Sequence, residues 1–234
     1  MVTRSAIDIL TDPPPEPADT RLAYGSDALQ FGDLRRAEGD GLAVVVHGGA
    51  WKAAYDLTHV DHLCVAFRDA GIATFNVEYR RVGDAGGGWP GSLEDVLRAV
   101  EYARRLAPHL VLVGHSAGGH LALLTAQQLR LPVVAVAAVS EPARWDNEAV
   151  QAFFAGEPPV EASPLAQAPL GVPVVLVHGT DDETVPFEQS VRYEQASKRE
   201  AELIALEGAG HFEPIDPLSP ESAVVRAAVE RLLA

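Results

Sequence analysis

The sequence has one cysteine, one methionine and few aromatic residues. A single cysteine excludes an internal disulfide bond, so the 234 residues must be held by a hydrophobic core, for which a hydrophobic content of 47% is sufficient. No run of about 18 apolar residues occurs, so we expect no membrane-spanning helix. The opening residues lack the apolar segment of a signal peptide. These absences predict a cytoplasmic protein.

Positive charge is also scarce. The chain has 18 lysine and arginine residues against 33 aspartate and glutamate residues, which gives a formal net charge of −15. Nucleic acids and anionic membrane surfaces would repel such a chain. We therefore expect neither as a partner.

Apolar runs and amphipathic segments alternate along most of the chain. The run at 42–50 ends in glycines, as a buried strand of a parallel sheet does. From there the predicted strands (72–80, 109–116, 131–140, 172–180, 201–208) alternate with predicted helices (60–71, 92–107, 117–129, 187–200, 220–234). Two short strands within 22–39 form an expected antiparallel pair. This pattern predicts the α/β class, as one domain spanning 1–234, with a mostly parallel sheet and helices on both faces.

Two further features of the chain concern its local structure. Ser92 and Asp95 have the spacing of a capping box at the start of a helix, with Asp in place of Glu. The long irregular stretch at about 142–171 lies between two predicted strands. Because excursions of this length are commonly lids or binding loops, we expect a short lid or insertion there.

A serine occurs where a predicted strand passes into a predicted helix. Residues 114–118, GHSAG, fit the pattern G-x-S-x-G. A sharp turn of this kind lifts the hydroxyl of Ser116 above the sheet, and small neighbours allow strand and helix to pass closely. A glycine-rich turn without catalytic function would look similar. The strand before it and the helix after it favour a nucleophile.

Acidic residues and a histidine follow the next strand ends in the order that serine catalysis requires. The segment HGTDDETVP (178–186) carries Asp181 and Asp182, and GAGHF (208–212) carries His211. A serine needs a histidine to take its proton, and the histidine needs a carboxylate to orient it. The order serine, acid, histidine is that of the α/β-hydrolase arrangement. A turn aspartate and a capping histidine are the alternative interpretation.

The motif HGGAW (47–51) follows the first buried parallel strand. Acyl transfer requires N–H donors that stabilise an oxyanion, and one of these is the amide after the nucleophile, that of Ala117. The others must come from the loop after the third strand, where this motif lies. We therefore predict an oxyanion hole formed by the amides of Gly49, Ala50 and Ala117.

These residues resemble the α/β-hydrolase superfamily over almost the whole chain. Within it, the chain is similar to small microbial carboxylesterases and to kynurenine formamidases, on the basis of HGGAW, the tripeptide Gly88-Trp89-Pro90 and GHSAGGHLA (114–122). The resemblance implies Ser116 as nucleophile and His211 as base. The family pattern HG-x-x-D-x-x-VP implies Asp182 as the triad acid and leaves Asp181 as a turn residue. The chain departs from the HGGG of many lipases, because it has alanine at position 50.

Several other residues are candidates for weaker roles. Trp51, Trp89 and Trp145 are candidates for the substrate pocket, although core packing would explain each of them. His59 and His62 are three residues apart on a predicted helix without an evident third ligand. We therefore expect a solvated helix face there, and we expect no metal or organic cofactor.

The sequence thus predicts a serine hydrolase that cleaves small acyl esters, a carboxylesterase, through a Ser-His-Asp triad and an acyl-enzyme. A short lid argues against long-chain triglycerides. The alternative within hydrolysis is an arylformamidase acting on N-formylkynurenine, which HGGAW and GWP motivate. A non-catalytic binding module is the alternative of another class, and the intact order of triad residues argues against it.

Overall fold

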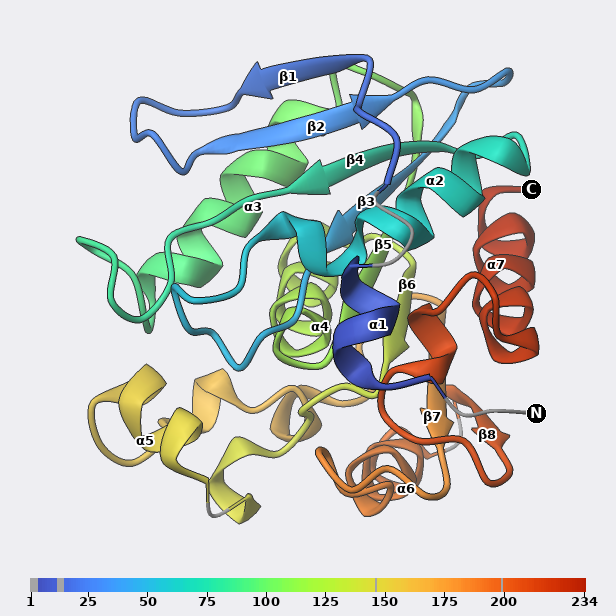
Figure 1. The fold of residues 1–234 in the computed structure, drawn as a ribbon. Helices are drawn as coiled ribbons and strands as arrows, with labels where there is room; N and C mark the ends of the chain where they lie inside the picture. The colour runs from blue at the N-terminus through green and yellow to red at the C-terminus, as the bar shows by residue number, and fades with distance from the viewer. Residues whose placement is uncertain (1–3, 12–14, 146, 199) are drawn as a thin grey trace.

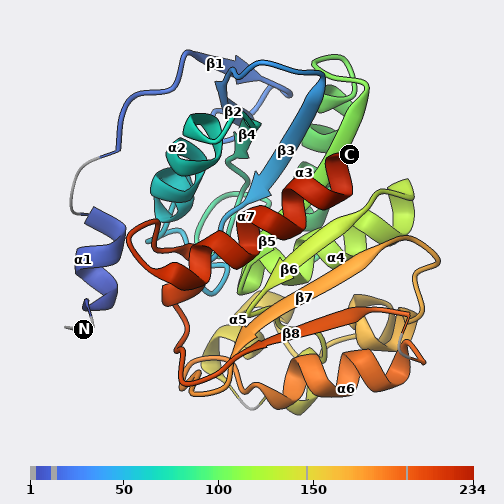
Figure 2. The same ribbon diagram turned by 90° about the vertical axis from the view of Figure 1, so that its right-hand side faces the viewer.

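The computed structural model describes residues 4–11, 15–145, 147–198 and 200–234, and its centre is one twisted sheet (Figures 1 and 2). The strands of the sheet are β1 (Thr20–Ala23), β2 (Phe31–Arg35), β3 (Gly41–Val46), β4 (Ala73–Val77), β5 (His109–His115), β6 (Val133–Val136), β7 (Val174–Gly179) and β8 (Glu202–Leu206). Their order in space is β1-β2-β4-β3-β5-β6-β7-β8. β5 therefore lies near the middle of the sheet, with β3 on one side and β6 on the other.

The sheet is mostly parallel, as predicted. β4, β3, β5, β6, β7 and β8 pair in parallel, whereas β2 pairs antiparallel with both β1 and β4. The predicted antiparallel pair is therefore confirmed, although its first strand begins at Thr20, two residues before the predicted range 22–39. Because the parallel strands share one direction, the loops after their carboxyl ends meet at one edge of the sheet, where α/β proteins bind their ligands.

Helices cover both faces of the sheet (Figure 2). α2 (Asp61–Asp69) and α7 (Pro220–Leu233) pack on one face, and α3 (Gly91–Ala103), α4 (Ala117–Leu129) and α6 (Glu188–Ala196) pack on the other. β3 shows why both faces need cover: Val44 packs with the α3 and α4 side, and Val45 packs with the α2 and α7 side. This alternation follows from the two-residue period of a strand. The α/β class with helices on both faces is confirmed.

Two local predictions were wrong. The sixth strand ends at Val136 and not at Ser140, because the backbone of Ala137 turns into the left-handed region at φ 46°. The expected capping box of Ser92 and Asp95 does not form. Ser92 Oγ donates to the carbonyl of Arg80 instead, and the buried Asp95 accepts from the guanidinium of Arg80. A long-range ion pair has taken the place of a local cap.

The described part of the stretch 142–171 folds into short helical pieces that come between β6 and β7 in the sequence and lie at the lower left of Figure 1. They are η2 (Pro142–Arg144), α5 (Glu148–Phe154), η3 (Val160–Ala162) and η4 (Leu165–Gln167). α5 buries Ala149, Val150 and Phe153 in the main core. This segment is therefore anchored by packing of its own.

The remaining short elements lie outside the sheet. α1 (Ala6–Thr11) was not predicted, and it buries only Ile9. η1 (Leu57–Val60) precedes α2, and η5 (Glu213–Ile215) follows His211. No helix in the described part of the chain is long and apolar enough to cross a membrane.

Candidate active site

Ser116 lies at the turn between β5 and α4, near the middle of the sheet. Its backbone has φ 56° and ψ −119°, an uncommon conformation for any residue other than glycine. A Cβ atom at Gly118 would lie 2.2 Å from the carbonyl oxygen of Val46, and one at Gly114 would lie 2.4 Å from that of Gly118. Only glycine therefore allows α4 to begin so close to β3 and β5. The hydroxyl stands at the N-terminus of a helix, whose dipole favours negative charge.

Asp182 and His211 meet at the ends of β7 and β8. His211 Nδ1 donates to Asp182 Oδ2 over 2.7 Å, and the side chain of Asp182 is fully buried. The other carboxylate oxygen, Oδ1, accepts the backbone N–H groups of Thr184 and Val185 at 2.8 Å each. Both oxygens of the carboxylate are therefore satisfied, and its orientation toward His211 is defined.

His178 is a second hydrogen-bond partner of the same carboxylate. Its Nε2 lies 3.1 Å from Asp182 Oδ2 and 3.0 Å from the carbonyl of Val185. Both of these atoms accept, so Nε2 carries the proton and Nδ1 accepts from Ser190 Oγ at 2.7 Å. Burial by itself would raise the pKa of Asp182, but the hydrogen bonds from His178 and His211 outweigh it and hold that pKa well below its usual range. Asp182 is therefore an anion at neutral pH.

The HGGAW loop has three consecutive residues with positive φ. Gly49 has φ 102°, Ala50 has φ 54° and Trp51 has φ 55°. A Cβ atom at Gly118 would also lie 2.3 Å from the carbonyl oxygen of His47, so this loop lies against the start of α4. Within the described residues, the amides of Gly49, Ala50 and Ala117 donate to no protein acceptor. The structure thus brings the three amides of the predicted oxyanion hole to one region and leaves them available.

The three predicted pocket tryptophans differ in exposure. Trp51 is fully buried, stacks on Phe153 with ring centroids 4.6 Å apart and lies edge-on to His120. Its ring therefore belongs to the core, which corrects its assignment to the substrate pocket. Trp89 and Trp145 are partly exposed and pack against the same core cluster.

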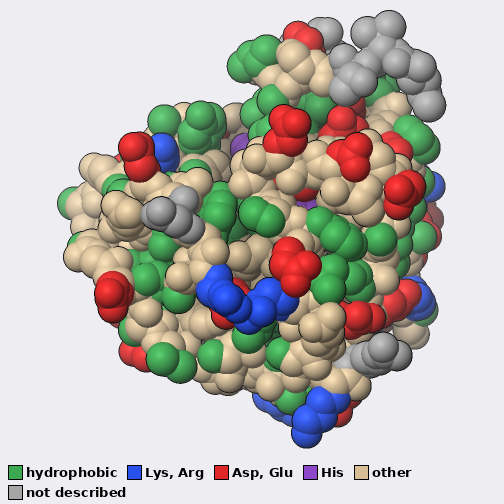
Figure 3. Space-filling model, turned by 90° about the horizontal axis from the view of Figure 1, so that it is seen from below, with side chains coloured by type: hydrophobic (Ala, Val, Ile, Leu, Met, Phe, Trp, Pro, Cys, Tyr) green, Lys and Arg blue, Asp and Glu red, His purple; other side chains and the backbone are tan. Residues whose placement is uncertain are grey.

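His59 and His62 are buried, each with 8% exposure, so the predicted solvated helix face was wrong. His59 Nε2 lies 2.9 Å from Nδ1 of His115, the residue before Ser116. His115 Nε2 in turn donates to the carbonyl of His211 at 3.0 Å. Figure 3 shows the molecule from below, and histidine side chains appear on this face only as small purple areas. The sequence carried no signal for this contact, because its partners are 56 residues apart.

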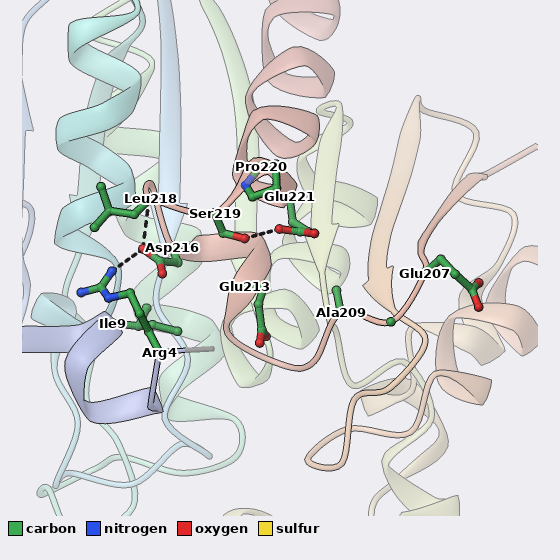
Figure 4. A pocket seen from close by; sticks show the side chains of 11 residues that line it. Arg4, Ile9, Glu207, Ala209, Glu213, Asp216, Leu218, Ser219, Pro220 and Glu221 are labelled. Atoms are coloured by element: carbon green, nitrogen blue, oxygen red, sulfur yellow. Dashed lines mark hydrogen bonds and ion pairs between the residues drawn. The ribbon is translucent and has the colours of Figure 1, made fainter. Parts of the chain in front are cut away.

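Two cavities border the loops that carry Asp182 and His211, and neither is lined by a residue of the predicted triad. One, of about 320 Å³, lies at the end of the segment 178–186 that carries Asp182. It is lined by Glu141, Arg144, Pro186, Glu188, Gln189 and Arg192. Glu141 does not pair with Arg144 there but with Arg192, at 2.7 Å. The other, of about 280 Å³, lies behind the loop that follows His211, where Asp216 bonds Arg4 at 2.6 Å and Leu218 lies nearby (Figure 4). Its lining includes no predicted catalytic residue.

An eight-stranded, mostly parallel sheet, covered by helices on both faces and carrying a serine at a central strand-to-helix turn, defines the α/β-hydrolase fold. Comparison with family models assigns the chain more closely. The serine hydrolase model matches residues 88–216, and the chain belongs to that family. A second model, BD-FAE, matches residues 35–140. A comparison with curated protein sequences found no match.

Solved structures share the fold over nearly the whole chain. A truncated carbohydrate esterase from gut microbiota is 19% identical with a TM-score of 0.78, over 92% of this chain and 98% of its own. An acetyl ester-xyloside bifunctional hydrolase from Caldicellulosiruptor lactoaceticus is 19% identical with a TM-score of 0.73, over 92% and 96%. A bacterial heroin esterase is 20% identical with a TM-score of 0.76, over 98% and 89%.

Proposed function

We propose that the protein is a carboxylesterase that hydrolyses small acyl esters through an acyl-enzyme on Ser116. The observation that carries this proposal is the 2.7 Å bond between His211 and Asp182. The ring of His211 also lies 4.6 Å, between centroids, from that of His115, which directly precedes Ser116. A base oriented by a buried carboxylate therefore lies against the residue next to the nucleophile.

The chemistry follows from these positions. Ser116 Oγ attacks the ester carbonyl while Nε2 of His211 takes its proton, and Asp182 stabilises the resulting imidazolium. The negative charge on the carbonyl oxygen accepts hydrogen bonds from the amides of Gly49, Ala50 and Ala117. The intermediate collapses to an acyl-serine as His211 protonates the departing alcohol. Water then repeats the sequence and releases the acid.

Two observations support a small substrate. The 142–171 segment is short, and its α5 is anchored by Phe153 in the core with Trp51, so it offers no large movable apolar cover. Relatives of the same fold are described as a carbohydrate esterase and as an acetyl ester-xyloside hydrolase. Acetylated sugars therefore belong among the first substrates to be tried.

A substrate series tests the proposal. We expect turnover of p-nitrophenyl acetate and acetylated xylose, with kcat/KM falling for the octanoate ester, and little turnover of N-formylkynurenine. A faster reaction with N-formylkynurenine than with any ester would instead favour the formamidase alternative. Ser116→Ala should abolish turnover, whereas Ser222→Ala, a change at a buried serine on α7, should not. Undiminished hydrolysis by Ser116→Ala would contradict the proposal, and the absence of turnover on every ester and formamide would favour the binding-module alternative.

A further inference from the structure

Two buried histidines connect the proposed base to a part of the chain that the mechanism above does not use. His59 comes from η1, His115 from the end of β5, and His211 from the loop after β8. The contacts run from His59 Nε2 to His115 Nδ1 at 2.9 Å, and from His115 Nε2 to the carbonyl of His211 at 3.0 Å. The side chains that make these contacts are 8% exposed at His59 and 2% exposed at His115. Three segments far apart in sequence are thus joined by two hydrogen bonds.

The geometry determines where the protons of this pair lie. A carbonyl oxygen only accepts, so Nε2 of His115 must carry a proton and donate to His211. A neutral His115 then has a bare Nδ1, which accepts from Nε2–H of His59. Nδ1 of His59 is buried without a partner, and a proton on that atom would be a donor with no acceptor. Burial and the neighbouring histidines also lower the pKa of His115 well below its usual value, and burial lowers that of His59 to about 3. Both rings are neutral, and each carries its proton on Nε2.

The HGGAW loop is shaped around the same pair. A Cβ atom at Gly48 would lie 2.9 Å from Nε2 of His59 and 3.0 Å from Nδ1 of His115, the two atoms of their hydrogen bond. Gly48 directly precedes Gly49 and Ala50, whose amides are the proposed donors to the oxyanion. The pair therefore contacts the loop of the oxyanion hole, the strand that ends at the nucleophile and the backbone of the base.

We propose that His59 and His115 are positioning residues, which hold the backbone of His211 in place relative to Ser116 and the HGGAW loop. Asp182 orients the ring of His211 through Nδ1, but that bond does not fix the main-chain atoms of the same residue. The bond from His115 to the carbonyl of His211 holds those atoms, in addition to the backbone bonds that hold the neighbouring Ala209 and Phe212. This role rests on the proposed function, because a positioning pair has an effect only if His211 is the base. A displacement of about 1 Å in such a site costs about 100-fold in rate.

Substitutions at His59 test the pair without touching the proposed triad. His59→Leu removes the donor, whereas His59→Gln retains a side-chain N–H that can reach Nδ1 of His115. We expect His59→Leu to lower kcat on p-nitrophenyl acetate by about 10- to 100-fold with KM changed less than about twofold. His59→Gln should recover most of that loss. His62→Leu is the matched control, because His62 is equally buried three residues away and forms no hydrogen bond with His115, so its kcat should stay near the wild-type value.

Nitrogen NMR of the wild-type protein with labelled histidine tests the pair even if His59→Leu fails to fold. We expect His115 to show a protonated Nε2 and a bare Nδ1 at neutral pH, and a shift of the Nδ1 resonance in His59→Gln. A proton on Nδ1 of His115, or a folded His59→Leu variant with wild-type kcat, would overturn the positioning role. These results are distinct from a failure of the proposed function, which undiminished activity of Ser116→Ala would reveal.

Discussion

His211 Nδ1 lies 2.7 Å from Oδ2 of Asp182, a carboxylate that no solvent reaches, whereas the preceding Asp181 is exposed. The backbone N–H of Asp181 donates to the carbonyl of Ala209 at 3.0 Å, so this residue joins the loop that carries Asp182 to the loop that carries His211. Two adjacent aspartates thus have unlike surroundings, and only the second contacts the proposed base.

The adjacent aspartates allow a matched comparison of single substitutions. Asp182→Asn keeps the shape of the side chain but removes the charge that stabilises an imidazolium, and it allows the wrong tautomer of His211. We expect kcat to fall by about 10⁴-fold, while Asp181→Asn changes it less than about threefold. Steady-state kinetics on p-nitrophenyl acetate measure both variants. Equal effects of the two substitutions would show that Asp182 is not the orienting acid.

Gly118, two residues after the proposed nucleophile, should tolerate no side chain. In Gly118→Ala the new methyl group would lie 2.2 Å from the carbonyl oxygen of Val46, a backbone atom that moves only with β3. We expect a loss of about 1–3 kcal/mol in the free energy of unfolding, together with reduced activity. Urea unfolding measures the first quantity. Gly41→Ala is the control, since its nearest neighbour at 3.1 Å is the flexible end of Leu233, and a comparable loss in that variant would contradict the steric argument.

Acid should weaken the fold through a buried histidine. Burial lowers the pKa of His120 to about 4, while the unfolded chain titrates near 6.5. Between these values the unfolded state binds a proton that the folded state does not, so the contribution is full above about pH 6.5 and is lost as pH falls toward 4. His120→Gln should remove up to about 3 kcal/mol of this decline, measured by urea unfolding at several pH values. A substitution of the exposed His109 is the control and should leave the pH dependence of the unfolding free energy unchanged. The same pH dependence in wild type and His120→Gln would refute this assignment.

The stretch 142–171 should depend on one of two adjacent phenylalanines. Phe153 is 2% exposed and stacks on Trp51, whereas Phe154 is only partly buried. We expect Phe153→Ala to cost about 3 kcal/mol of unfolding free energy and Phe154→Ala clearly less, because the first opens a cavity in the core. Thermal or chemical unfolding distinguishes them. If Phe154→Ala is the more harmful change, the core anchor of α5 has been misassigned.

The periodicity of apolar residues in the sequence predicted most of the fold. α4 begins and ends where its pattern predicts, and the alternation of strands and helices placed Ser116, Asp182 and His211 at one edge of a parallel sheet. These predictions succeeded because strand ends and glycine turns leave local signals. The predictions that failed depended on contacts between distant segments.

His59 illustrates such a contact. Its helical neighbours gave no reason to expect burial, because its hydrogen-bond partner, His115, lies on the central strand. Ser92 likewise carries a local capping pattern, but its hydroxyl binds the carbonyl of Arg80. Trp51 could line a pocket or fill the core, and only the packing of Phe153 against it decides for the core. In each case, tertiary packing outweighed a local preference.

Covalent labelling tests directly whether Ser116 is the nucleophile. Folded wild-type protein is treated with a fluorophosphonate, its intact mass is measured, and the modified peptide is sequenced. We expect a single adduct on Ser116, absent from Ser116→Ala and formed far more slowly in Asp182→Asn, because the serine reacts only when His211 is oriented to take its proton. Active, folded protein that acquires no adduct, or carries it on a residue other than Ser116, would contradict the assignment of Ser116 as the nucleophile.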